Sequence, residues 1–251
     1  MHSSLSHPVR INSLVAGAVT LLFIFGCSAK EDFNQSAQEF ADKYVTNCST
    51  DSLDMEDRDS AKSQVADFYD DRGLEKQHSG DFKGAIEDYM KAIEACPERA
   101  TSYYNIGTAK AASESYIEAI DSYGKAIELN PQYGVAYTNR GQAKSRLGKY
   151  KEAIEDYSKA IAIDGKDFYA HANRAHAKDK IGDQEGALVD YTKAIEILPR
   201  PGFYASRGAV SFSMGNAANA CSDIRKAASL GDERSSEWLR QGGEGWCRRN
   251  E

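Results

Sequence analysis

The 251-residue chain has little of what catalytic and nucleic-acid-binding proteins usually require. Its 31 lysines and arginines are outnumbered by 38 aspartates and glutamates, and the net charge of −7 gives no basic footprint for DNA or RNA, whose binding is therefore disfavoured. Only five histidines occur, and His171 and His176 are five residues apart, on different faces of a helix rather than around one metal ion. No CxxC, HExxH, phosphate-loop or nucleophile-elbow motif is present. The sequence therefore predicts no catalytic residue, no metal site and no cofactor.

Long apolar runs are also missing, except for one at the amino terminus. Residues 11–26 are almost wholly apolar and follow the single positive charge of Arg10. The run is shorter than the roughly 20 residues that a membrane-spanning helix needs. Residues 1–26 are therefore predicted to be an export signal, with an uncleaved anchor as the alternative.

The end of this run carries a more specific pattern, Ile24-Phe25-Gly26-Cys27. It resembles the lipobox of bacterial lipoproteins, in which the cysteine is acylated and becomes the first residue of the mature protein. The resemblance implies that Cys27 is a lipidation site; an ordinary cleaved signal is the alternative. Because Ser28 stands where an Asp would signal inner-membrane retention, it also implies an outer-membrane anchor facing the periplasm.

Small residues recur with a period of about 34 residues. They are Gly73, Gly107, Gly141, Ala175 and Gly208, at position 8 of each unit. Alanines fill positions 20 and 27 of all five units, and position 24 is a tyrosine in the first four: Tyr89, Tyr123, Tyr157 and Tyr191. Small side chains let two antiparallel helices approach closely, while the aromatic ring fills the volume between them. The period therefore predicts a series of helix-turn-helix units.

Turn residues support the same units. Glycines stand at position 15 of four units, where the first helix must end in a left-handed turn, and prolines stand at position 32 of three. The whole pattern resembles the tetratricopeptide repeat (TPR), and resembles bacterial TPR lipoproteins when the lipobox is included. The resemblance implies an all-α, right-handed superhelical solenoid of about five repeats with flanking helices. The repeats would span residues 66–99, 100–133, 134–167, 168–200 and 201–231.

The segments outside the repeats are predicted from their polarity. Residues 27–60 would form a lipid-anchored tether with one short helix over residues 35–46, followed by an acidic loop over residues 48–60. Residues 232–241 are predicted to be a capping helix that buries Trp238 and Leu239. The tail from residue 242 to residue 251 is too rich in glycine and polar residues for a helix to be predicted.

Paired charges predict one set of contacts inside the repeats. Arginine at position 7 and aspartate at position 23 occur together in four repeats, while the second repeat has Ile106 and Ser122 instead. Each position is eight residues from the turn, so the two side chains should face one another across the helix pair. The expected pairs are Arg72–Asp88, Arg140–Asp156, Arg174–Asp190 and Arg207–Asp223. The alternative is a basic stripe that binds a ligand.

Four cysteines remain besides Cys27, and an exported protein can form disulfides from them. Sequence position favours Cys48 with Cys96 and Cys221 with Cys247 among the three connectivities. The alternative is that Cys96 and Cys221 are buried thiols.

The TPR resemblance also implies where a ligand would bind. In such arrays the first helix of each repeat lines a concave groove, here neutral and polar. The implied groove residues are Tyr104, Asn105, Thr108, Asn139, Gln142, Tyr169, Asn173 and His176. The amides of Asn105, Asn139 and Asn173 could hydrogen-bond the main chain of an extended peptide, or could simply face solvent. The clamp by which TPR co-chaperones hold heat-shock chaperone tails is matched only at Asn139.

These observations favour a scaffold or adaptor, tethered to the bacterial cell envelope, that binds proteins or extended peptides. The alternative is an envelope enzyme or small-molecule binder with a site inside the solenoid. The sequence does not identify the partner.

Overall fold

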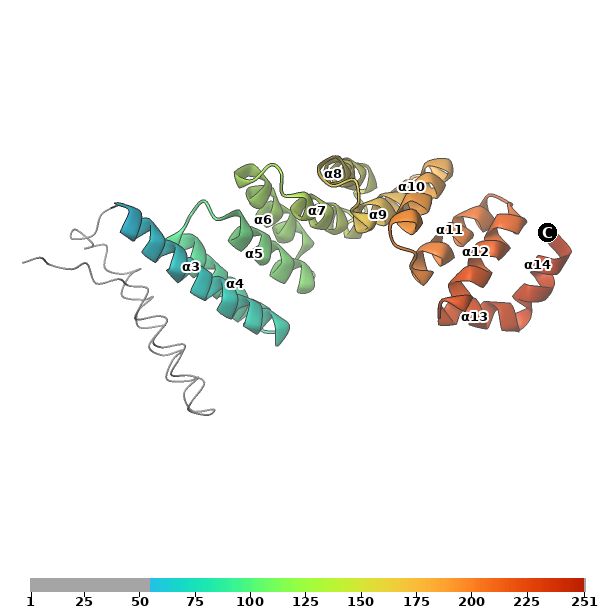
Figure 1. Cartoon of the computed structure of the whole chain (residues 1–251), viewed down its shortest axis with the longest axis horizontal. Coiled ribbons are helices and arrows are strands. Elements are labelled where there is room, and N and C mark those ends of the chain that lie inside the picture. The colour runs from blue at the N-terminus through green and yellow to red at the C-terminus, as the bar shows by residue number, and fades with distance from the viewer. Residues whose placement is uncertain (1–54, 251) are drawn as a thin grey trace, which may run out of the picture. The chain divides into compact units, whose positions relative to one another are not determined.

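The computed structural model describes residues 55–250, whose regular structure is entirely helical (Figure 1). The elements are α3 (Met55–His78), α4 (Phe82–Ala95), α5 (Ala100–Ala112), α6 (Tyr116–Leu129), α7 (Gly134–Arg146), α8 (Tyr150–Ile163), α9 (Phe168–Lys180), α10 (Gln184–Ile197), α11 (Pro201–Ser213), α12 (Ala217–Ser229), α13 (Glu233–Trp238), η1 (Leu239–Gly243) and α14 (Glu244–Asn250). No helix in this range combines the length and apolar character needed to cross a membrane. The predicted export signal, Cys27, the helix over residues 35–46 and Cys48 lie outside the described residues.

Residues from Tyr69 onward form one compact unit of stacked helix pairs, while residues 55–68 belong to a separate unit. Within the larger unit α5 packs on α6, α7 on α8, α9 on α10 and α11 on α12, and each pair also packs on the next. Figure 1 shows these helices following one another in chain order. The predicted all-α TPR solenoid is therefore confirmed.

The amino-terminal boundary differs from the prediction. The acidic loop expected over residues 48–60 is wrong for residues 55–60, because α3 begins at Met55. Acidic residues are favourable in the first turn of a helix, where they face the positive end of the backbone dipole. The acidic composition that suggested a loop is therefore equally suited to a helix start.

Glycine and tyrosine meet inside each of the first three helix pairs, as the 34-residue period predicts. Tyr89, Tyr123 and Tyr157 are at most 1% exposed. A Cβ added at Gly73, Gly107 or Gly141 would lie 2.5, 2.6 or 2.8 Å from the nearest ring atom. Such distances are too short for any real contact, so position 8 is small because the ring occupies that space.

The four expected arginine–aspartate pairs all form. Each guanidinium donates two hydrogen bonds to one carboxylate, with Nε to Oδ2 distances of 2.8, 2.9, 2.8 and 2.8 Å along the chain. These pairs are Arg72–Asp88, Arg140–Asp156, Arg174–Asp190 and Arg207–Asp223. The aspartates are buried, so the alternative of a basic ligand-binding stripe is wrong for these arginines.

A lysine at position 11 adds a second cation to three of these carboxylates. Lys76, Lys144 and Lys178 lie 2.7, 2.8 and 2.9 Å from Asp88, Asp156 and Asp190. Burial alone would raise the pKa of Asp190, but hydrogen bonds from Arg174 and Lys178 hold that pKa below its ordinary value. In the second repeat, which has no aspartate at position 23, Lys110 pairs with Glu118 at 3.2 Å instead.

The turns between paired helices also follow the prediction, with one exception. Gly80, Gly148, Gly182 and Gly215 have φ between 74° and 87°. In the second repeat this place is taken by Glu114, whose φ is 62°. A non-glycine residue in this region costs about 1 kcal/mol.

The carboxy-terminal tail is helical, contrary to the sequence-based expectation. The predicted cap over residues 232–241 is interrupted, because α13 ends at Trp238 and the chain bends at Gly242 (φ 112°) before α14. A disulfide joins Cys221 of α12 to Cys247 of α14, with the Cα atoms 5.7 Å apart, so the buried-thiol alternative does not hold for Cys221. Tertiary contacts of this kind outweigh poor local helix propensity.

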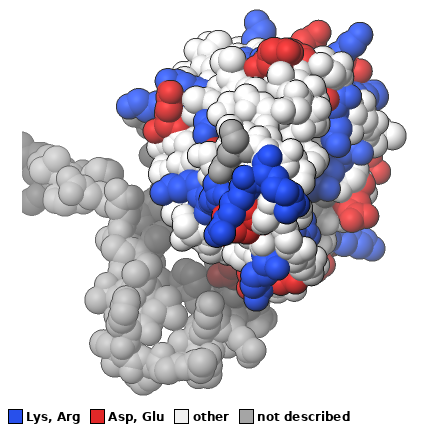
Figure 2. Space-filling model, turned by 90° about the vertical axis from the view of Figure 1, so that its right-hand side faces the viewer, with Lys and Arg blue, Asp and Glu red and all other residues white. Residues whose placement is uncertain are grey.

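Two further contacts hold α14 in place. Arg225 pairs with Glu244 at 3.0 Å, and the Trp246 ring lies 5.1 Å from Phe212 and 6.1 Å from Trp238. Trp238 and Leu239, predicted to be buried by the cap, are half-buried. Figure 2 views this end of the molecule and shows acidic and basic side chains interspersed on it.

Candidate functional site

A hollow of about 230 Å³ lies between α5 and α7, on the predicted groove face; we call it the α5–α7 pocket. Three of the eight predicted groove residues line it: Thr108, Asn139 and Gln142. The full lining is Thr108, Ala111 and Ala112 from α5, Tyr116 and Tyr123 from α6, and Asn139, Gln142, Ala143 and Arg146 from α7. The structure therefore brings residues of the second and third repeats together around one space.

The local sequence explains why the space is there. Positions 12 and 13 of the second repeat are Ala111 and Ala112, whose short side chains leave room at the end of α5. The third repeat has the larger Ser145 and Arg146 at these positions. One wall of the hollow is formed by the buried Tyr123. The pocket is thus a consequence of two successive alanines in one repeat.

Asn139 is held by the solenoid itself. Its Nδ2 donates a hydrogen bond of 2.9 Å to the hydroxyl of Tyr104, which links α7 to α5. The Tyr104 ring packs on Tyr123 and Tyr133, with centroids 5.8 and 5.1 Å away. Asn139 was predicted to offer its amide to a peptide, but part of that amide serves repeat stacking. Its side-chain oxygen is the group left for a ligand.

The tyrosine hydroxyls beside the pocket are neutral. Burial raises the pKa of Tyr104, and burial is also the largest cause of the raised pKa of Tyr123. The Thr108 hydroxyl donates to the Tyr104 carbonyl oxygen at 2.8 Å. The tyrosine and threonine hydroxyls at this wall are therefore hydrogen-bonding groups without charge.

Other predicted groove residues keep their polar groups available. Within residues 55–250, no hydrogen bond is formed by the side-chain amides of Asn105, Gln142 and Asn173. Asn105 and Asn173 are half-buried, and Gln142 and His176 are exposed. These groups have donors and acceptors that a bound chain could use.

Tyr169 lies apart from the pocket, in a different cluster. Its ring is 49% exposed, and its hydroxyl accepts a hydrogen bond of 3.0 Å from Arg200. The Arg200 guanidinium also lies 5.1 Å from the Phe168 centroid and 5.3 Å from that of Tyr169. This cation–π cluster places Tyr169 at the junction of the fourth and fifth repeats.

Arg146 is a candidate site residue that the sequence reasoning missed. It occupies position 13, a groove position, and its exposed side chain lines the α5–α7 pocket. Partial burial, and then the positive charge of Lys180, lower the pKa of His176, and Arg146 acts in the same direction. Arg146, Lys180 and His176 therefore share one electrostatic neighbourhood. The prediction of a neutral groove is wrong at this place, and reading position 13 would have shown it.

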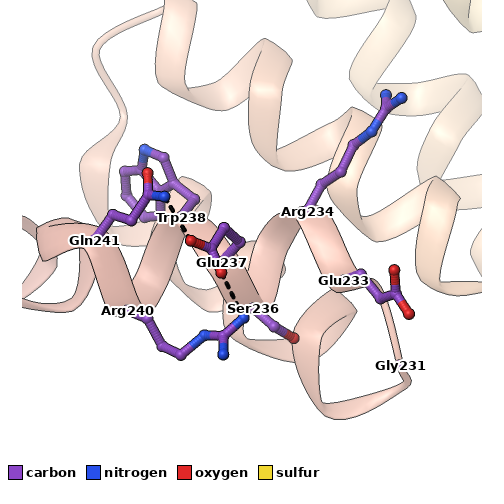
Figure 3. A pocket seen from close by; sticks show the side chains of 8 residues that line it. All are labelled: Gly231, Glu233, Arg234, Ser236, Glu237, Trp238, Arg240 and Gln241. Carbon is purple, nitrogen blue, oxygen red and sulfur yellow. Dashed lines mark hydrogen bonds and ion pairs between the residues drawn. The ribbon is translucent and has the colours of Figure 1, made fainter.

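A second hollow, of about 730 Å³, lies at the carboxy-terminal cap (Figure 3). It is broad and open, and Glu237 in it already interacts with Arg240 and Gln241. None of the predicted groove residues lines it. Within the described part of the chain no three potential metal ligands cluster together.

Known proteins resemble this chain in both sequence pattern and structure. Two family models, both described as tetratricopeptide repeat, match the chain, one at residues 66–99 and 100–133 and the other at residues 134–167. No curated protein matches the sequence significantly. Many solved structures do match, and three of them illustrate the range.

MamA is 26% identical, covers 65% of this chain and 96% of its own, and has a TM-score of 0.60. YrrB, described as a TPR protein with an unusual peptide-binding site, is 21% identical over 70% of this chain and 92% of its own, with a TM-score of 0.59. PilF from Pseudomonas aeruginosa is 16% identical over 75% and 88%, with a TM-score of 0.67. The last two show the fold alone. The chain therefore contains tetratricopeptide repeats and folds as a TPR solenoid.

Proposed function

We propose that this protein is a non-enzymatic interaction scaffold that binds extended peptide segments of partner proteins along α5, α7 and α9. The observation that carries the proposal is the set of side-chain amides on this face that form no hydrogen bond within residues 55–250, next to an open pocket. An amide offers both a donor and an acceptor, which is what the main chain of an extended peptide needs. YrrB, a TPR protein of similar fold, is described as having a peptide-binding site, and this supports the same use here.

The size of the α5–α7 pocket fits a peptide better than a small metabolite. At about 230 Å³ it is smaller than the roughly 300–1,000 Å³ of sites that enclose a drug-sized ligand. A single side chain or chain terminus can enter it while the rest of the peptide lies along the helices. The alternative of an envelope enzyme or small-molecule binder gains no support from either hollow, because both open to solvent.

We further propose that the scaffold is tethered to the cell envelope through an acylated Cys27, at the outer membrane and facing the periplasm. The Cys221–Cys247 disulfide supports this location, since such bonds persist in oxidising compartments. Metabolic labelling with a radioactive fatty acid should mark the wild-type chain in the outer-membrane fraction and leave Cys27→Ser unlabelled. Equal labelling of the variant would refute the tether.

Binding along the first helices can be tested by crosslinking in cells. A photo-crosslinking amino acid would replace Gln142 or His176, both exposed on the proposed binding face. The matched controls are Ile117 of α6 and Val189 of α10, which are 68% and 69% exposed but lie on second helices. We expect the first two positions to capture protein partners and the controls to capture none of them. Equal capture from the controls would place the binding surface elsewhere.

The amides themselves can be tested in the same assay. The double variant Asn105→Ala and Asn173→Ala removes two groups that have no hydrogen-bond partner within residues 55–250. We expect capture from Gln142 to weaken while helical content, measured by circular dichroism, stays unchanged. Undiminished capture would show that these amides do not contact the partner.

A further inference from the structure

We infer that the α5–α7 pocket is the binding site for a carboxylate of the bound peptide and that Arg146 binds this carboxylate. This inference rests on the proposed peptide-binding function and names the chemistry that selects the peptide. Asn139 is the one residue of this pocket that matches the chaperone-tail clamp, and Arg146 stands at a repeat position that the clamp does not use.

Arg146 differs from the arginines that stabilise the repeats. Arg140, six residues earlier on the same helix, is bound by a buried aspartate through two hydrogen bonds of 2.9 and 2.7 Å. Arg146 is exposed, and no residue between 55 and 250 forms an ion pair with it. A guanidinium with its N–H donors available matches the two oxygens of a carboxylate in a bidentate geometry. Arg146 is therefore placed to bind an external acid.

The charge of the pocket follows from the residues that line it. None of the nine residues around it is an aspartate or glutamate, and the one charged group is Arg146. Lys180 adds positive charge in the same neighbourhood, as its effect on His176 shows, with Asp179 acting in the opposite direction. This local charge is opposite to the net charge of −7 of the whole chain. A carboxylate would thus be favoured here over a cationic or neutral side chain.

The shape of the pocket agrees with one carboxylate-bearing group. Ala111 and Ala112 leave the space open from the α5 side, and the Gln142 amide on α7 can donate a further hydrogen bond. An acidic side chain and the carboxyl terminus of a peptide present the same chemical group. The two sources can be separated by testing peptides with and without a free terminus.

The test uses four pools of octapeptides, labelled with an uncharged BODIPY dye that adds no carboxylate, with the full chain purified in detergent. Each pool has glutamate or glutamine fixed at the fourth residue, serine, alanine and glycine elsewhere, and either an amidated or a free carboxyl terminus. Fluorescence anisotropy measures the dissociation constants. We expect the amidated glutamate pool to bind about 5- to 10-fold more tightly than the amidated glutamine pool, the range expected for one charge-assisted contact at a partly exposed site. If instead the two pools with a free carboxyl terminus bind more tightly than the two amidated pools, whichever residue is fixed at the fourth position, the bound carboxylate is that of the chain end. This result also supports the inference.

Three variants assign the preference to the pocket. Arg146→Gln should abolish the preference, and Ala112→Leu should reduce it by filling the space. Arg234→Gln is the matched control, because Arg234 is an exposed arginine of α13 with no ion pair inside residues 55–250. The control should bind like the wild type, and circular dichroism should show that all variants remain helical.

Two results would overturn the inference, and they differ in what else they refute. Tight but equal binding of all four pools, unchanged by Arg146→Gln, would refute the carboxylate site and leave the proposed peptide binding intact. If no pool binds, both the proposed peptide binding on this face and the carboxylate site are refuted.

Discussion

The charge pair of the third repeat should be replaceable by the neutral pair of the second repeat, provided that both residues change together. In the third repeat Arg140 and Lys144 both contact the buried carboxylate of Asp156. The second repeat has Ile106 and Ser122 at the two corresponding positions and still forms the same helix pair. The chain thus contains its own evidence that the neutral combination folds.

The single changes should be costly for different reasons. Asp156→Ser leaves Arg140 and Lys144, whose side chains are only 21% and 13% exposed, without their shared acid. Breaking a buried pair costs about 3–5 kcal/mol, and because both cations keep some contact with water we expect about 2–3 kcal/mol here. Arg140→Ile leaves the acid with Lys144 as a partner, so we expect about 1–2 kcal/mol.

The double variant should recover most of this loss. With Arg140→Ile and Asp156→Ser together, no buried acid remains, and Lys144 can turn to Glu152, which stands where Glu118 receives Lys110 in the second repeat. Replacing an ion pair by a packed neutral pair is often close to neutral in stability. We expect the double variant to lie within about 1 kcal/mol of the wild type.

Urea unfolding followed by circular dichroism would measure these differences, with hydrogen exchange of α7 and α8 as a local readout. The local readout matters because stacked repeats can unfold in parts rather than in one step. The reasoning predicts a coupling of at least about 2 kcal/mol between the two substitutions. Simple additivity of the two single costs would refute it, since the ion pair would then not be what the two residues share.

Three further outcomes follow from the packing, the disulfide and the buried acids. Gly141→Ala should lower the free energy of unfolding in urea by about 1–2 kcal/mol, because the added Cβ would lie 2.8 Å from the Tyr157 ring. The cost of this overpacking exceeds the gain in helix propensity, and an unchanged stability would contradict the account. Cys247→Ser should remove hydrogen-exchange protection from α14 and leave α7 and α8 protected, since the bond closes a loop across 26 residues; unchanged protection of α14 would show the bond to be dispensable. The depressed pKa of Asp190 contributes stability above its unfolded pKa of about 4, which is lost as the pH falls through the folded value. The melting temperature should therefore decline below about pH 4, and less steeply in Asp190→Asn; equal slopes would exclude this acid as a source.

The sequence predicts the repeats well because their rules are local and recur. The small residue at position 8 and the tyrosine at position 24 meet in each of the first three units, so their spacing alone places both helices. Arg140 and Asp156 could be paired from sequence because they are equally distant from a glycine turn. Both inferences need only the geometry of one antiparallel helix pair.

The secondary structure at the two ends of the described chain could not be predicted in this way, because these segments lie outside the repeat pattern. Residues 244–250 look unsuited to a helix, yet a disulfide from Cys247 and an ion pair from Glu244 attach them to α12. At the other end, the acids of residues 55–60 suit both a loop and a helix start. In each case the deciding contribution is tertiary or positional, and composition does not contain it.

The pocket lies where the second repeat departs most from the others. This repeat has no arginine–aspartate pair, and Glu114 takes a left-handed conformation that glycine takes in the other four turns between paired helices. It also ends α5 with the two alanines that open the α5–α7 pocket. The neutral pair should cost little, but the left-handed Glu114 and the space left beside the two alanines give up stability that the neighbouring repeats retain. Such losses concentrate at binding sites because a site must leave space and polar groups unused until the ligand arrives. The same departures from the stabilising pattern therefore accompany the pocket that we propose as the peptide-binding site.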